Sequence, residues 1–199
     1  MTSRPDDTVG IVVPLRSFTL AKARLAAALD APARSALIRT MAERVVAAAG
    51  THRVGVVSSA PEVRSWAAAH GLDVVDDPGT LDAAAVAGRR WARALGCTRY
   101  AIVHADLPRA TSLDAVVADR ARSVAVIVPD HRNDGTPVLS LPTAVDFTFA
   151  YGPGSAARHE LEAKRVGLAV RVVHDPDLAF DVDVPSDLDA LAAHERCPG

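Results

Sequence analysis

Short runs of β-branched residues alternate with alanine-rich stretches from the start of the chain to about residue 130. Apolar runs of this length are typical of buried strands, and strands that alternate with helices are typical of βαβ units around a mostly parallel sheet. The expected strands span 9–15, 53–59, 72–77, 99–106 and 123–130, and the expected helices span 31–50, 61–71 and 80–96. The pattern therefore predicts a three-layer, doubly wound α/β fold with a mixed, mostly parallel sheet.

The helix expected over 31–50 is predicted by the spacing of its apolar residues. Leu37, Met41, Val45 and Ala48 recur on one face, as a period of 3.6 residues requires. Gly50 follows, and glycine is the residue type that most often ends a helix. The segment is therefore expected to be an amphipathic helix that closes at Gly50.

The pattern changes after residue 130. The segment 131–142 indicates a turn that leads into a different strand, and 152–167 indicates a loop that opens a helix. The segments 168–176 and 180–184 are expected to complete the sheet. Ser186 is expected to cap a last helix, because a serine side chain can accept a hydrogen bond from a free backbone N–H of the first turn.

The totals limit the classes of function. With 199 residues, 49% of them hydrophobic, the chain predicts one domain over 1–199, with flexible ends at 1–8 and 196–199. A formal net charge of −2 offers no basic surface for nucleic acid, and no apolar run approaches the roughly 20 residues of a membrane span. No leader segment is recognisable, so the expected location is cytoplasmic. Cys97 and Cys197 lack metal-ligand spacing and are expected to stay thiols there.

Asp181 and Asp183 stand one residue apart among apolar neighbours. In a strand, residues i and i+2 project to the same face, so the two carboxylates would lie side by side while Phe180 and Val182 face the core. Like charges so close together are unfavourable unless a cation lies between them, and hard oxygen ligands suit Mg²⁺. The alternative is that Asp183 caps the following helix and Asp181 pairs with an arginine.

Asp106 supplies a third carboxylate in the stretch HADLP (104–108). It ends an expected strand, and the carboxyl ends of strands are where open α/β sheets bind ligands. The alternative is that Asp106 starts a helix, as an aspartate before Leu-Pro commonly does.

Two glycine-containing turns and a basic loop are candidates for anion binding. Backbone N–H groups at a helix start, with a hydroxyl beside them, can bind an anion. The tripeptide Gly135-Thr136-Pro137 and the stretch YGPGSAARH (151–159) each supply glycine N–H groups and a hydroxyl side chain. Arg16, Lys22 and Arg24 follow the first strand and could hold a triphosphate. The alternatives are an ordinary helix entry for each turn and solvated side chains for the three basic residues.

Four blocks together resemble a known family, the phosphoenolpyruvate or 2-phospho-L-lactate guanylyltransferases of deazaflavin coenzyme F(420) biosynthesis. VPLRSFTLAKARLA (13–26) is similar to the opening block of that family, and HADLP is similar to its strand-end aspartate block. DGTPVL (134–139) with YGPGSAARH resembles its glycine blocks, and FDVDVPSDL (180–188) resembles its final block.

The resemblance implies a glycosyltransferase-A-like nucleotidyltransferase that joins GTP to a small phosphorylated acid and releases pyrophosphate. It implies Mg²⁺ as the cofactor. The expected working form is a monomer or a homodimer, and the sequence does not distinguish the two. The implied metal ligands are Asp106, Asp181 and Asp183. The implied catalytic residues are Lys22 and Arg24, facing the GTP phosphates. The implied nucleotide-binding residues are Leu15, Arg16 and Asp82, and the implied residues for the acid are Thr136, Gly152 and Ser155.

The chain departs from the family pattern at three positions. Arg16 stands where the family usually has lysine, Asp82 where it has asparagine, and Pro137 replaces the residue after Gly-Thr. Two other readings remain open. One is a related nucleotidyltransferase of other specificity, although the chain lacks a glycine-rich loop after its first strand; the other is a catalytically silent nucleotide-binding homologue. The sequence does not distinguish phosphoenolpyruvate, 2-phospholactate and 3-phosphoglycerate as the acid.

Overall fold

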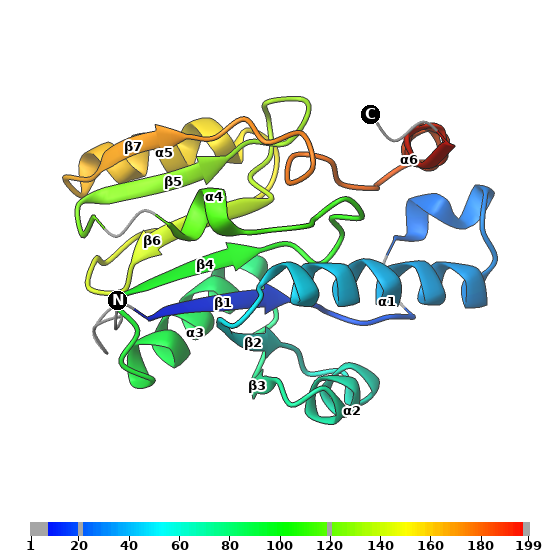
Figure 1. The fold of residues 1–199 in the computed structure, drawn as a ribbon, viewed down its shortest axis with the longest axis horizontal. Helices are drawn as coiled ribbons and strands as arrows, with labels where there is room; N and C mark the ends of the chain where they lie inside the picture. The colour runs from blue at the N-terminus through cyan, green and yellow to red at the C-terminus, as the bar shows by residue number, and fades with distance from the viewer. Residues whose placement is uncertain (1–7, 20–21, 119–120, 197–199) are drawn as a thin grey trace.

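The computed structural model describes residues 8–19, 22–118 and 121–196, and its centre is a seven-stranded sheet (Figure 1). The strands are β1 (Val9–Pro14), β2 (Arg53–Val57), β3 (Asp73–Val75), β4 (Arg99–Val103), β5 (Val124–Val128), β6 (Val138–Pro142) and β7 (Ala169–Val172). They lie in the order β3-β2-β1-β4-β6-β5-β7. β6 is antiparallel to both of its neighbours, and the other pairs are parallel.

Helices cover both faces of the sheet (Figure 1). One face carries α1 (Ala31–Ala48), α2 (Pro61–Ala69), α4 (Asp114–Val117), α6 (Pro185–Arg196) and the short 3-10 helix η1 (Ala23–Ala27). The other face carries α3 (Leu81–Ala94) and α5 (Ser155–Arg165). The predicted three-layer, mostly parallel α/β fold is therefore confirmed.

Alternation along each strand builds two cores. Ile11 and Val13 of β1 belong to the core under α1, whereas Val12 between them belongs to the core under α3. All three side chains are fully buried, and burying an aliphatic side chain of this size contributes about 1.5–3 kcal/mol. Because both faces are covered, the strands are apolar at most positions, which is why they appear in the sequence as short apolar runs.

Close packing sets the position of α3. A Cβ atom added to Gly88 would lie 2.2 Å from Cγ1 of Val12, so only glycine lets this helix approach β1 so closely. α3 begins at Leu81, after Thr80 accepts a hydrogen bond from the N–H of Ala83. The contact between Gly88 and Val12 therefore holds the middle of α3 against the middle of β1.

Two predictions at the end of the chain are wrong. The segment 180–184 is not a strand, and the sheet ends with β7. The N–H groups of Asp183 and Val184 donate to the carboxylate of Asp187 at 2.7 and 2.9 Å instead of to a neighbouring strand. Asp183 and Val184 immediately precede α6, which begins at Pro185 and includes Ser186. Ser186 therefore lies inside the helix and is not its cap.

Some predictions concern residues outside the described part of the chain. Of the ends expected to be flexible, 1–7 and 197–199 lie outside it, while Arg196 is the last residue of α6. Cys97 is buried and free, and Cys197 also lies outside. Within the described residues, no helix combines the length and apolar character that crossing a membrane requires.

Candidate active site

The topology brings several predicted site residues to one edge of the sheet. β6 runs antiparallel to β4, so its first residue lies beside the last residue of β4, and Val103 pairs with Val138. One step further, the N–H of His104 donates to the carbonyl of Pro137 at 2.9 Å. Asp106 follows β4 and Thr136 precedes β6. Both residues therefore reach the edge at which the parallel strands end.

Asp106, Asp181 and Asp183 form a compact acidic cluster at this edge. Each offers one carboxylate oxygen, and these oxygens all lie within 4.8 Å of one another. Two carboxylate oxygens of these residues, Oδ1 of Asp106 and Oδ1 of Asp181, are buried without a hydrogen-bond partner among the described residues. The side chain of His131 comes within 3.5 Å of Asp181 Oδ1. The cluster therefore has buried acceptor atoms that the fold leaves unsatisfied.

Lys22 bridges two members of the cluster. Its Nζ lies 2.5 Å from Asp106 Oδ2 and 2.6 Å from Asp183 Oδ1. The backbone of Lys22 is left-handed, with φ of 58°, a conformation that a non-glycine residue rarely adopts. The lysine is thus held in an unusual conformation by two carboxylates that follow it far along the chain.

The pKa values of these groups follow from burial and charge. Burial alone would raise the pKa of Asp106, but Lys22 and His104 outweigh it, and the pKa lies below its ordinary value. Burial, followed by the charges of Asp106 and Asp183, raises the pKa of Asp181 above its ordinary value. For Lys22, burial acts to lower the pKa, but Asp106 and Asp183 together raise it. The ammonium group of Lys22 therefore stabilises the ionised form of Asp106, whereas the negative charge of Asp181 is poorly neutralised.

A short loop before α6 holds two of the carboxylates in place. Phe180 and Val182 are buried on either side of Asp181, as predicted, although the segment is a loop. The guanidinium of Arg109 lies 3.9 Å from the centroid of the Phe180 ring, a cation-π contact. These anchors fix Asp181 and Asp183 toward the edge of the sheet.

The donor set fits a hard divalent cation. Three carboxylates and one ammonium carry a net charge of −2 when all are ionised, and buried anionic oxygens without partners are costly unless a cation binds them. Mg²⁺ prefers oxygen ligands and commonly uses a few carboxylates together with substrate phosphates. The residues present therefore fit Mg²⁺.

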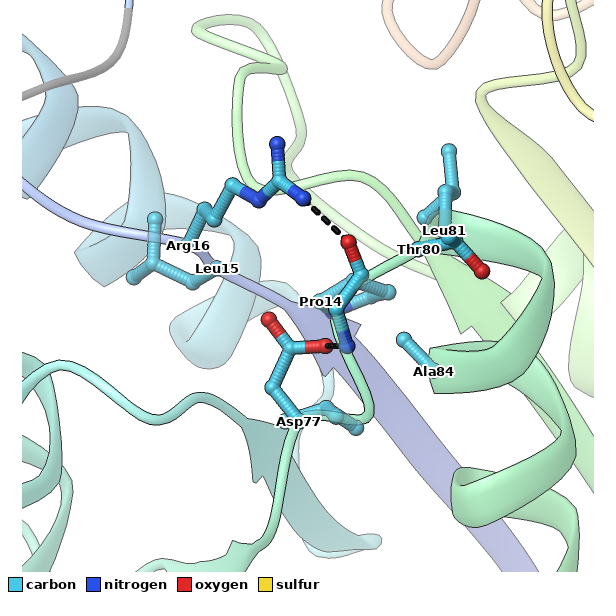
Figure 2. A pocket seen from close by; sticks show the side chains of 9 residues that line it. Pro14, Leu15, Arg16, Asp77, Thr80, Leu81 and Ala84 are labelled. Carbon is cyan, nitrogen blue, oxygen red and sulfur yellow. Dashed lines mark hydrogen bonds between the residues drawn. The ribbon is translucent and has the colours of Figure 1, made fainter.

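Three hollows run along the edge past Lys22. The first has a volume of about 370 Å³ and is lined by Pro14, Leu15, Arg16, Val57, Asp77, Gly79, Thr80, Leu81 and Ala84 (Figure 2). The second shares Pro14, Leu15, Arg16 and Leu81 with the first and adds Lys22, His104 and Asp106. The third is lined by Lys22, Ala23, Arg24 and Asp183. The three hollows, which we together call the trough, share lining residues from one to the next between the loop after β3 and the acidic cluster.

Arg16 and Asp77 shape the first hollow (Figure 2). The guanidinium of Arg16 reaches across the opening and donates to the carbonyl of Gly79. One carboxylate oxygen of Asp77 accepts a hydrogen bond from the N–H of Gly79 at 2.8 Å. Asp77 is the acidic residue of the lining. The hollow thus combines apolar walls with one carboxylate and one guanidinium.

A buried chain of hydrogen bonds lies on the other side of β4. Oγ1 of Thr136 is 3.1 Å from Oγ of Ser155 and 3.1 Å from Nδ1 of His159. We call these three residues the hydroxyl-imidazole chain. All are at most 2% exposed. Their aromatic neighbour Tyr151 lies 4.8 Å from the His159 ring and 5.5 Å from the His104 ring, and His104 lines the second hollow.

The remaining predicted residues lie around these groups. Gly152 has a φ of 103°, which suits glycine, and it precedes the first turn of α5. Leu15 is buried and lines the first two hollows, and Arg24 is exposed at the third. Asp82 accepts a hydrogen bond from the N–H of Tyr151 at 2.8 Å. Asp82 therefore connects α3 to the glycine turn, a contact that the sequence did not predict.

Asp77 was missed by sequence reasoning, although a signal was present. It follows β3 as Asp106 follows β4, and both strands end at the same edge of the sheet. The rule that located Asp106 applies to Asp77 as well.

Comparison with known proteins adds sequence relatives. The profile of the family described as "Guanylyl transferase CofC like" matches residues 9–197. A phosphoenolpyruvate guanylyltransferase from Sphaerobacter thermophilus is 36% identical over 190 residues, covering 92% of each chain. A 3-phospho-D-glycerate guanylyltransferase from Phenylobacterium zucineum is 31% identical over 187 residues, covering 88% of this chain and 86% of the relative.

Solved structures share the fold at low sequence identity. A putative nucleotide-diphospho-sugar transferase from Desulfovibrio desulfuricans G20 superposes with a TM-score of 0.72 at 14% identity, covering 96% of this chain and 89% of the other. A nucleotidyl transferase from Methanothermobacter thermautotroptrophicus superposes with a TM-score of 0.67 at 17% identity, covering 96% and 99%. At these identities the likeness shows the fold alone.

Proposed function

The chain belongs to the family of CofC-like guanylyl transferases, and we propose that it joins GTP to a small phosphorylated carboxylic acid with release of pyrophosphate. Guanylyl transfer to a small phosphorylated acid is the function that the relatives support. The finer points, which are the metal, the roles of individual residues and the identity of the acid, rest on the geometry of the trough.

One observation carries the proposal. The acidic cluster and Lys22 lie at the junction of the second and third hollows, beside the first hollow, whose volume of about 370 Å³ leaves room for a nucleoside. Two polyanions must meet in the reaction, and unit charges about 4 Å apart repel by roughly 4 kcal/mol at an effective dielectric constant near 20. Carboxylates that bind a cation at this point would reduce that repulsion.

The transfer requires no general base from the protein. A phosphate oxygen of the acid is ionised at neutral pH and would form a bond to the α-phosphorus of GTP. The bond from that phosphorus to the bridging oxygen breaks, and pyrophosphate leaves with the electron pair. Lys22 and Arg24 would stabilise the charge on the leaving group, since both line the third hollow.

Asp106, Asp181 and Asp183 would hold Mg²⁺. The unpartnered oxygens of Asp106 and Asp181 support this role. When bound, Mg²⁺ neutralises phosphate charge and orients the reacting groups.

The nucleoside would occupy the first hollow. Guanine presents two adjacent donors, N1–H and the 2-amino group, and a carboxylate is the acceptor that matches them. Asp77 provides that carboxylate. Leu15 and Leu81 supply apolar walls, and Arg16 covers the opening as long as it bonds Gly79.

Phosphoenolpyruvate is the acid that we propose. The relatives with that name include proteins more similar to this chain than the 3-phospho-D-glycerate enzyme is. Thr136, Gly152 and Ser155 would hold the phosphate and carboxylate of the acid. We further propose that the product serves deazaflavin coenzyme F(420) biosynthesis, on the strength of the four sequence blocks.

A product assay tests the proposal. The protein is incubated with GTP, Mg²⁺ and one of three acids, phosphoenolpyruvate, 2-phospholactate or 3-phosphoglycerate, and the nucleotide adduct is identified by mass. We expect a guanylylated phosphoenolpyruvate and an equal amount of pyrophosphate. Binding of GTP without pyrophosphate release for any acid would indicate a catalytically silent homologue instead.

A further inference from the structure

His159 lies at the inner end of the hydroxyl-imidazole chain, and its two ring nitrogens have different partners. Nε2 is 3.1 Å from the backbone N of Ala150, and Nδ1 is 3.1 Å from Oγ1 of Thr136. A backbone N–H can only donate, so Nε2 must be the unprotonated nitrogen. In a neutral imidazole the proton then resides on Nδ1, and Nδ1 donates to Thr136.

The hydroxyl hydrogens can now be counted. Thr136 and Ser155 carry one hydroxyl hydrogen each, and one of the two is used in the bond between them. Thr136 receives a hydrogen from His159 and gives none back. One hydroxyl hydrogen, on either Thr136 or Ser155, therefore stays available for an acceptor other than these three residues.

The opposite tautomer would reverse this result. If Nδ1 were the acceptor, Thr136 would donate to His159 and Ser155 would donate to Thr136. The pair would then present only lone pairs to a ligand. An anion such as a phosphate or a carboxylate has only acceptor oxygens, so it would meet no donor.

The surroundings of His159 keep the imidazole neutral. Its ring lies 4.8 Å from the ring of Tyr151 and 5.8 Å from that of Phe147, and the residue is fully buried. Burial is the main cause that lowers the pKa of His159 to about 4. A neutral ring with one donor and one acceptor is therefore the form present near pH 7.

We propose that His159 is a positioning residue that fixes the direction of the hydrogen bonds through Thr136 and Ser155, so that the pair offers a hydrogen-bond donor to the phosphorylated acid. The proposal rests on the proposed function for the identity of that acid. His159 does not touch the substrate, and Ala150 sets its tautomer. The backbone N–H of Ala150 thereby determines, through two successive hydrogen bonds, whether Thr136 and Ser155 offer a ligand a donor or only acceptors.

The tautomer can be tested without any substrate. Long-range proton–nitrogen correlation spectra of the ¹⁵N-labelled protein distinguish a protonated from an unprotonated ring nitrogen. We expect a protonated Nδ1 and an unprotonated Nε2 for His159, with no change between pH 6 and pH 8. A protonated Nε2 would overturn the inference, even if the enzyme is fully active.

A matched pair of variants tests the link to the acid. In His159→Asn the amide nitrogen takes the place of Nδ1 and can still donate to Thr136, whereas His159→Leu has no donor. Both variants lose the acceptor for Ala150, so they differ chiefly in the bond to Thr136. We expect the KM for phosphoenolpyruvate to rise about tenfold or more in His159→Leu and to stay within about threefold in His159→Asn. The KM for GTP should be unchanged in both.

Direct binding separates the inference from the proposed function. Titration of phosphoenolpyruvate into the protein with Mg²⁺ and no GTP should repeat the order wild type, Asn variant, Leu variant. Equal losses in the two variants would mean that His159 is only a packing residue, and the inference would fall. A wild-type protein that forms no adduct with any acid would instead remove the proposed function, while the spectra still report the tautomer.

Discussion

The acidic cluster and the hydroxyl-imidazole chain lie at the same edge of the sheet and satisfy their polar atoms in opposite ways. In the cluster, two buried carboxylate oxygens find no hydrogen-bond partner among the described residues, and one ammonium faces three carboxylates. In the hydroxyl-imidazole chain, Thr136, Ser155 and His159 are buried and neutral, and Thr136 is hydrogen-bonded to both of the others. The fold satisfies the second group except for one hydroxyl hydrogen, whereas it leaves the carboxylates of the first group without a sufficient counter-charge.

The difference follows from the energetics of charge and of hydrogen bonds. A buried neutral polar group needs only one well-placed partner, and the surrounding backbone can provide it. A buried cluster of like charges needs a counter-charge, which helices and strands cannot provide. We therefore expect variants of the cluster to change activity and metal binding, and variants of the chain to change acid affinity and stability.

The largest effect is expected at Asp181. Asp181→Asn removes a charge from the cluster and should lower guanylyl transfer by roughly 10²-fold or more at saturating Mg²⁺. Pyrophosphate release measures it. Asp146→Asn is the control, because the Asp146 side chain is 98% exposed and pairs with Arg89 far from the cluster. Full turnover in Asp181→Asn would remove the metal role of that residue.

Asp77 lies outside the acidic cluster, so we expect it to affect GTP binding through hydrogen bonds and to leave metal binding unchanged. Asp77→Asn replaces an acceptor by a donor in the first hollow, and we expect the KM for GTP to rise by about ten- to a hundredfold. The affinity for Mg²⁺ measured without nucleotide should not change. The neighbouring Asp76→Asn is the control, since that side chain is 93% exposed and pairs with Arg64. An equal effect in both variants would rule out the base contact.

The hydroxyl-imidazole chain should make stability depend on pH. The pKa of His159 in the folded state, about 4, is below its ordinary value of 6.5. The free energy of unfolding therefore has its full value, as far as His159 is concerned, above about pH 6.5. It falls as the pH drops from 6.5 towards 4, and the loss is about 2 kcal/mol at pH 5. The charged or titratable groups around the ring include Tyr151, which packs against it, and Asp82, Arg158, His104 and Glu162.

Urea unfolding at pH 8 and pH 5 measures this contribution. The comparison is between the wild type and His159→Asn, because the titration of all other groups is then shared. We expect the wild type to lose more stability than the variant on going to pH 5. A pH dependence that is the same in both proteins would contradict the neutral, buried imidazole.

The smallest effect is expected at Lys22 in the free protein. Lys22→Gln removes the ammonium that competes for Asp106 and Asp183, so the affinity for Mg²⁺ without substrates should rise about tenfold, while guanylyl transfer should fall. Calorimetric titration of Mg²⁺ measures the first change. Lys164→Gln is the control, since Lys164 is exposed on α5. Weaker Mg²⁺ binding in Lys22→Gln would show that the lysine supports the metal site instead of competing for it.

The sheet was predictable because both of its faces are covered. Strands such as β4, buried at every position, stand out in the sequence as apolar runs, and the helices between them follow from apolar spacing. The same reasoning failed at 180–184, because alternate burial also arises in an extended loop. Periodicity shows which side chains are inside, whereas the partner of the backbone, here the side chain of Asp187, leaves no periodic signal.

The candidate site was predictable only in part. The rule that strand ends carry ligand-binding residues located Asp106, and the resemblance located most of the others. The contact between Lys22 and the cluster and the contact of Asp82 with Tyr151 join segments far apart in the sequence, and the tautomer of His159 depends on how its ring meets the backbone of Ala150. Such contacts have no local pattern, so they became visible only in the folded chain.

The bond between Lys22 and Asp183 joins residues 161 positions apart, from the first loop to the last. This contact closes almost the whole chain into one loop, and the entropic cost of closing a loop rises only slowly with its length. During synthesis, the ribosome must release nearly the whole polypeptide before both residues can meet. For most of its time as a nascent chain, this protein has no complete acidic cluster, and a C-terminal truncation before residue 181 would never acquire one.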